Sequence, residues 1–214
     1  MNKKENLILA KKKVTDAGLY IATIDDIEQL ASIAEDAYEN YPLHNWFTNG
    51  KYNASLSKKI MAISLKAVIK NGIIYSDSKD ATGFAIWLPP NFKGINTFSF
   101  LAHGGISLIF QYGLPTILKM QSYENFAMAL KKKHTNNKDW YLYNLSIKKV
   151  FQGKGKATEL LTPMLNFCNE NSYFCYLETN KEENVPIYQH FGFILKETTF
   201  IPDSSVSHFA MLKK

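Results

Sequence analysis

Apolar residues recur at helical spacing in two stretches of the N-terminal half. In residues 27–37 they stand three or four positions apart, which is the spacing of one face of an α-helix. The polar run of residues 23–26 (Thr-Ile-Asp-Asp) is typical of a helix start, and a short β-rich run, residues 19–23, leads into it. Residues 53–70 repeat the helical pattern and stop at an Asn-Gly pair, residues 71–72. The pattern predicts a short strand followed by two amphipathic helices.

Strand patterns follow, first as a pair and then around a glycine-containing loop. Residues 73–76 and 82–88 are rich in β-branched and aromatic residues and flank the polar residues 77–80, which predicts a hairpin. Further along, residues 140–147 predict a strand, 158–171 an amphipathic helix and 173–179 another strand. Helices and strands therefore alternate along the chain.

Residues 98–120 are largely apolar and about as long as a membrane span. They also contain His103, two adjacent glycines, Gln111 and a Gly-Leu-Pro break at residues 113–115. We therefore expect two helices broken near residues 112–115 and no membrane contact. Residues 1–13 carry an apolar patch of four residues, which is too short for a signal peptide. A cytoplasmic location is the expectation.

The loop at residues 152–157 (Gln-Gly-Lys-Gly-Lys-Ala) lies between a predicted strand and a predicted helix. A glycine turn that leads into a helix directs unpaired backbone N–H groups toward one point, where the helix dipole favours a phosphate. Gly153 and Gly155 permit backbone angles that other residues resist. The spacing fits neither a Walker loop nor the dinucleotide motif. The loop is therefore a candidate anion site, with a plain structural turn as the alternative.

Glutamine, two residues, glycine, one residue, then glycine or alanine is also the pyrophosphate-binding signature of the GNAT N-acetyltransferases, which the chain resembles from about Trp140 to its end. Residues 142–147 look like that family's fourth strand and 173–179 like its fifth. Residues 184–193 resemble the short helix and Gly-Phe turn before its sixth strand. Two departures stand out: Lys149 replaces a common proline, and the second motif has a short Asn-x-x-x-Tyr form, which puts the role of Asn184 in doubt.

The resemblance implies an α/β (α+β) fold with a mixed central sheet flanked by helices, in a single domain over residues 1–214. Residues 91–138 exceed the usual connection and are expected to form a helical insertion before the fourth strand, as a cover beside the acceptor site. The implied reaction is acetyl transfer from acetyl-coenzyme A to the amine of a small molecule or peptide. The implied coenzyme-binding residues are Leu145, Ser146, Ile147, Gln152, Gly153, Lys154, Gly155, Lys156, Ala157, Thr158 and Asn184.

By its place in the second motif, Tyr188 matches the family's general-acid tyrosine. A phenol suits that role, since it is protonated at neutral pH and can donate a proton to a departing thiolate. The alternative is a packing role under the phenylalanines that follow it. Glu178, at the end of the predicted fifth strand, is the candidate general base or water relay, or else a solvated strand end. His103, His134 and His190 are expected to be structural or exposed. The aromatic segment around His44, with Trp46, Phe47, Trp87 and Tyr143, is a candidate acceptor wall.

The charged residues of the chain indicate which classes of binding partner to expect. The 214 residues carry a formal charge of +6, and every one of the 25 basic residues is a lysine. Nucleic-acid recognition favours the arginine fork, so we expect no nucleic-acid partner, although the lysine run at residues 131–133 keeps an RNA-binding alternative open. The other alternative is a non-catalytic acyl-coenzyme A sensor. The positive charge favours a small neutral or anionic amine as acceptor.

The two cysteines, Cys168 and Cys175, fall on apolar positions of a predicted helix and strand and are expected to be buried thiols. No metal-ligand cluster is visible in the sequence, so no metal is expected. The chain is expected to be a monomer or a homodimer.

Overall fold

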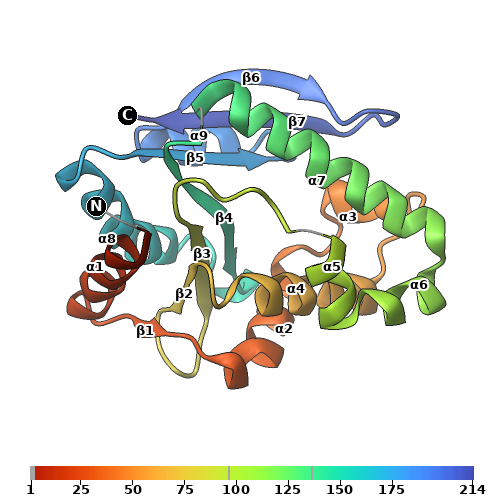
Figure 1. Cartoon of the computed structure of the whole chain (residues 1–214), viewed down its shortest axis with the longest axis horizontal. Helices are drawn as coiled ribbons and strands as arrows, with labels where there is room; N and C mark the ends of the chain where they lie inside the picture. The colour runs from red at the N-terminus through yellow and green to blue at the C-terminus, as the bar shows by residue number, and fades with distance from the viewer. Residues whose placement is uncertain (1–2, 96, 136) are drawn as a thin grey trace.

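The computed structural model describes residues 3–95, 97–135 and 137–214 (Figure 1). Within these ranges one seven-stranded sheet has the order β1-β2-β3-β4-β5-β7-β6. Neighbouring strands are antiparallel except for the central parallel pair β4 and β5. The strands are β1 Tyr20–Ile21, β2 Ile73–Ser76, β3 Gly83–Leu88, β4 Asp139–Ile147, β5 Phe174–Thr179, β6 Ile194–Phe200 and β7 Ser207–Lys213.

Helices cover both faces of the sheet, which confirms the expected mixed fold. Helices α1 Lys3–Asp16 and α8 Lys156–Glu170 pack on one face, and α2 Ile27–Ala37 and α4 Ala54–Val68 pack on the other (Figure 1). Strand β3 is buried along its whole length. Ala85 and Trp87 belong to the core on the side of α1 and α8, while Phe84, Ile86 and Leu88 belong to the core on the side of α2 and α4. A strand covered on both faces has no polar alternation.

The two predicted N-terminal helices and the hairpin β2–β3 are confirmed. A short 3₁₀ turn, η1 Ile24–Asp26, precedes α2, and the carboxylate of Asp26 accepts the Thr23 backbone N–H at 2.7 Å. Helix α4 ends at Val68, before the Asn-Gly pair. Gly72 is required there for space, since an added Cβ would lie 2.7 Å from Leu88 Cδ2.

The short helix α3 Pro42–Phe47 was not predicted from the sequence, and neither were helix α1 and strand β7. Helix α1 forms from the lysine-studded N-terminus and packs Ala10 and Val14 into the core beside α8. Strand β7 lies between β5 and β6 and is buried over its five inner residues. Both are stabilised by partners distant in sequence.

The apolar segment folds as α5 Thr97–Phe100, η2 Leu101–Gly105, α6 Ile106–Tyr112 and α7 Leu114–Thr135. The predicted break is present at Gly113, where φ is +80°, and Gly104 with φ +124° adds a second break. No helix of the described residues is long and apolar enough to cross a membrane. Residues 96 and 136 of the expected insertion lie outside the described residues. That residues 91–138 are an insertion relative to the family that the chain resembles stays a prediction.

Candidate functional site

A cleft opens where β4 and β5 part. The two strands pair only from Asp139 and Phe174 to Tyr141 and Tyr176, although β4 continues to Ile147 and β5 to Thr179. The cleft between their ends has a volume of about 650 Å³. Its walls come from β4, the glycine loop, the start of α8 and helix α9 Asn184–His190. The separation leaves backbone groups of β4 without a strand partner, which suits an extended amide-containing ligand.

The glycine loop closes one end of this cleft. Gly153 and Gly155 both adopt left-handed backbone angles, with φ of +71° and +78°. Gly155 is the N-cap of α8 and accepts the Glu159 N–H, so the N–H groups of the first helical turn have no intrahelical partner. Gln152 donates to the Ile147 carbonyl at 2.9 Å and ties the loop to the end of β4. The loop therefore has the geometry of an anion site.

The two loop lysines have other partners in this structure. Lys156 forms ion pairs with Asp77 at 2.9 Å and with Glu159 at 2.8 Å. Its hydrogen bonds to Glu159 and Asp77 raise the pKa of Lys156. The Lys154 ammonium lies 5.7 Å from the centre of the Phe151 ring. The positive pole of the site is thus formed chiefly by backbone N–H groups.

The other expected coenzyme residues divide into two groups. Leu145, Ile147, Thr158 and Asn184 line the cleft. Asn184 also donates to Thr179 Oγ1 at 3.0 Å, which fixes the start of α9 to the end of β5. Ser146 is fully buried and is not among the residues that line the cleft, and its hydroxyl donates to Asn144. Its side chain is engaged elsewhere, so only its backbone remains for a ligand.

Tyr188 lines the cleft from α9. Its ring packs edge-on against Phe193, with centroids 6.1 Å apart. Among the described residues its hydroxyl has no hydrogen-bond partner. Burial raises the pKa of Tyr188, so the phenol stays protonated at neutral pH. Both expected roles, proton donor and packing residue, are compatible with this position, and the catalytic role stays a prediction.

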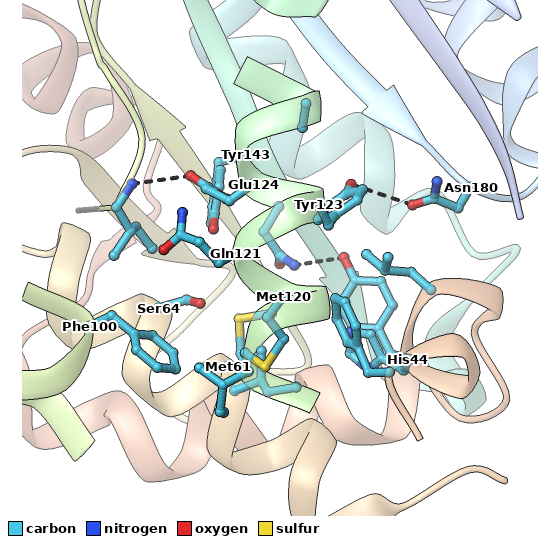
Figure 2. A pocket seen from close by; sticks show the side chains of 18 of the residues that line it. His44, Met61, Ser64, Phe100, Met120, Gln121, Tyr123, Glu124, Tyr143 and Asn180 are labelled. Carbon is cyan, nitrogen blue, oxygen red and sulfur yellow. Dashed lines mark hydrogen bonds between the residues drawn. The ribbon is translucent and has the colours of Figure 1, made fainter. Parts of the chain in front are cut away.

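A second cavity, of about 390 Å³, adjoins the cleft beneath α7 (Figure 2). Tyr38 and Tyr41 line both spaces and mark their junction. The Tyr38 hydroxyl accepts a hydrogen bond from Asn144 at 2.7 Å, and Asn144 accepts one from Ser146 at 2.9 Å. This chain fixes Tyr38 at the point where the two spaces meet.

Glu178 lies in the wall of the second cavity. Its Oε1 accepts a hydrogen bond from the Tyr141 hydroxyl. Its Oε2 is buried without a hydrogen bond, 3.6 Å from the Nε2 of fully buried His208. The solvated strand end is therefore excluded, and a role as base or relay stays a prediction.

Sequence reasoning missed Glu124, which lines the same cavity from α7. One of its oxygens accepts the Ile95 N–H at 3.1 Å. Burial raises the pKa of Glu124 to about 7. One signal was present in the sequence: Glu124 is the only acidic residue between Asp80 and Asp139.

The expected acceptor wall is only partly present. Phe47 and Tyr143 line the cavity. Trp87 is buried in the core on the opposite face of the sheet, and Trp46 is not among the lining residues and contacts Lys119 instead. His44 lines the cavity with its Nδ1 hydrogen-bonded to Ser57 at 2.7 Å. Burial lowers the pKa of His44 to about 4, so it is neutral at pH 7.

The remaining candidates lie apart from this junction. His103 Nδ1 lies 2.6 Å from the Ser99 carbonyl, and His134 pairs with Glu197 at 2.8 Å. His190 borders the outer part of the cleft. Cys168 and Cys175 are buried free thiols, as expected. No group of metal-binding side chains occurs among the described residues.

Comparison with known proteins agrees with this geometry. A model of the acetyltransferase (GNAT) domain matches residues 120–214. An uncharacterised N-acetyltransferase of Schizosaccharomyces pombe is 25% identical over 185 residues, which are 82% of this chain and 74% of the relative.

Two solved structures have a similar fold. A Corynebacterium glutamicum protein described as histone acetyltransferase HPA2 and related acetyltransferase has a TM-score of 0.62 at 19% identity, covering 91% of this chain and 94% of its own. The polyamine N-acetyltransferase of Drosophila melanogaster has a TM-score of 0.56 at 10% identity, covering 91% and 97%. At these identities the likeness establishes the fold.

Proposed function

We propose, from the premise that this chain belongs to the GNAT acetyltransferase family, that it moves the acetyl group of acetyl-coenzyme A directly to a primary amine. Membership of this family supports acetyl transfer in general. The observation that carries the finer proposal is the early separation of β4 from β5, which leads from the glycine loop to the tyrosine junction. Such a cleft suits a long ligand with a phosphate end and a reactive end.

The coenzyme occupies the cleft in this proposal. Its pyrophosphate lies on the N–H groups of residues 152–157, where the helix dipole and the left-handed glycines favour an anion. The pantetheine arm runs beside Leu145 and Ile147 and forms hydrogen bonds with the unpaired edge of β4. The thioester then lies near Tyr188 and the junction at Tyr38 and Tyr41.

The acceptor enters the cavity beneath α7, which meets the cleft at that junction. The acceptor first releases one proton of its ammonium form to water. The neutral amine nitrogen then attacks the thioester carbonyl carbon, the carbon–sulfur bond breaks, and an amide forms. Tyr188 donates its hydroxyl proton to the departing sulfur, and the proton lost by the amine returns to the phenolate through water. Helix α7 serves as the cover over the acceptor, as proposed for residues 91–138.

Tyr188→Phe tests the proton donor. A positioned acid contributes about 10²- to 10⁴-fold to the rate. The thiol of coenzyme A is itself acidic, so its thiolate depends less on a proton donor and the loss should lie near the low end of this range. We expect kcat to fall at least about tenfold. Coenzyme affinity and thermal stability should change little, because the ring that packs against Phe193 is retained. The assay is release of free thiol, with single-turnover kinetics to show that chemistry limits the rate.

Tyr112→Phe is the matched control, because Tyr112 lines neither the cleft nor the cavity. A wild-type rate for Tyr188→Phe would assign Tyr188 to packing. Coenzyme binding without thiol release from any amine in a broad panel would contradict the proposed reaction.

A further inference from the structure

The second cavity is acidic inside a basic protein. The chain has 25 lysines, yet no lysine is among the cavity's described lining residues. The charged groups that line it are the carboxyls of Glu124 and Glu178. His44 adds no positive charge, because burial keeps its pKa at about 4. The interior therefore favours a cation, which is opposite to what the net charge of the protein suggests.

The two carboxylates differ in their partners. Glu178 accepts the Tyr141 hydroxyl and lies 3.6 Å from His208. Glu124 has one hydrogen bond, from the Ile95 N–H, and no cationic partner among the described residues. The nearest buried lysine, Lys131, is paired with Asp139 at 3.1 Å. Glu124 is thus the cavity carboxylate that lacks a counter-ion, a costly arrangement unless a ligand supplies one.

Aromatic rings surround this carboxylate. Burial is the main cause of the raised pKa of Tyr143 and of Tyr141. Glu124 is near enough to contribute to both, as the next cause for Tyr143 and after Glu178 and Tyr123 for Tyr141. Figure 2 shows Glu124 beside Tyr143, with the apolar side chains of Met61, Phe100 and Met120 lying across the cavity. Ring faces and a carboxylate together attract an organic ammonium, while the apolar far side suits a hydrocarbon body.

We propose that this cavity selects a primary ammonium carried on an apolar body, and that Glu124 binds the ammonium group. The inference rests on the proposed function for the acceptor's place beside the coenzyme. Burial raises the pKa of Tyr143, and Glu124 and Tyr38 both raise it further, so Glu124 and the junction at Tyr38 lie near the same ring. Glu178 already accepts a hydrogen bond from the Tyr141 hydroxyl, and most of the remaining lining is apolar. The further ammonium groups of a polyamine would therefore lack a free partner, so polyamines are disfavoured, and an anionic group would face two carboxyls.

Isothermal titration of the full-length protein, saturated with coenzyme A, tests this selection without requiring turnover. The probes are 2-phenylethylamine, its neutral analogue 2-phenylethanol, the anion 3-phenylpropionate and the polyamine spermidine. We expect 2-phenylethylamine to bind at least about tenfold more tightly than the other three, as one charge-assisted hydrogen bond would give. If the wild-type protein binds any of the other three probes more tightly than 2-phenylethylamine, that result is enough to overturn the inference.

Glu124→Gln then assigns the residue, because glutamine keeps the shape and can still accept the Ile95 N–H. We expect it to weaken 2-phenylethylamine at least about tenfold and to leave 2-phenylethanol unchanged. Glu182→Gln, on the exposed surface, is the control. Unchanged amine affinity in Glu124→Gln would overturn the role of Glu124.

The two proposals fail separately. Acetyl-coenzyme A is titrated first, without amine, and its failure to bind contradicts the proposed function. If the coenzyme binds and 2-phenylethylamine does not, the acceptor inference is wrong and the proposed function stands.

Discussion

Glu124→Gln should make the ligand-free protein more stable at alkaline pH. Burial raises the pKa of Glu124 from its ordinary 4.5 to about 7. Between these values the folded protein holds a proton that the unfolded chain has released. The free energy of unfolding therefore falls as pH rises through this window, and the loss is complete above pH 7. Glutamine has no proton to release, so the variant does not lose this part of the free energy of unfolding.

The magnitude follows from the same values. A tenfold change in proton affinity corresponds to about 1.36 kcal/mol, so a change from 4.5 to about 7 corresponds to about 3 kcal/mol. Part of the Glu124 side chain is exposed to the cavity, which lowers the cost of its charge. We therefore expect the variant to gain about 1–3 kcal/mol at pH 8 and less than about 1 kcal/mol at pH 5.

Urea unfolding at pH 5 and pH 8 measures this difference directly. The exposed residue Glu182 provides the control, because its replacement by glutamine should leave the pH dependence unchanged. A Glu124→Gln protein that is no more stable than wild type at pH 8 would refute the reasoning, since the carboxylate would then be compensated in the folded state. Occupation of the cavity by an ammonium should reduce the gain.

Three further variants test the proposed coenzyme site and the buried ion pair. Gly155→Val should lose stability as well as coenzyme affinity, because a β-branched residue resists φ of +78°. Gly155→Asn tolerates that angle and should lose at least about tenfold in coenzyme affinity by titration, with stability within about 1 kcal/mol; wild-type affinity would remove the loop from the site. Lys131→Met should cost about 3–5 kcal/mol in urea unfolding, because it leaves Asp139 buried without its cation. A loss below about 1 kcal/mol would contradict this.

Local pattern determined the parts of the fold that depend on neighbours in sequence. Helical periodicity predicted α2 and α4, and the polar turn between two β-rich runs predicted the hairpin β2–β3. The glycine loop was readable because left-handed backbone angles demand particular residues at particular positions, and Gly153 and Gly155 adopt them. Gly113 ended a helix for the same reason.

Tertiary structure alone decided where distant residues meet. The point at which β4 leaves β5 depends on pairing between residues more than 30 positions apart, such as Tyr141 and Tyr176, which no local pattern encodes. Helix α1 appears because α8 and the sheet supply an apolar surface for it. Tyr38, which directly follows the last residue of α2, is held at the junction by a hydrogen bond from Asn144 of β4.

The charge inside the second cavity was also decided by tertiary structure. The 25 lysines give the chain its net positive charge, from which we predicted a neutral or anionic acceptor. In the structure no lysine is among the described lining residues of the cavity, whereas Glu124 and Glu178 are. The sequence determines which charges the protein carries. Their consequence depends on burial and on nearby partners, because both the desolvation cost and the strength of an ion pair change with the surroundings.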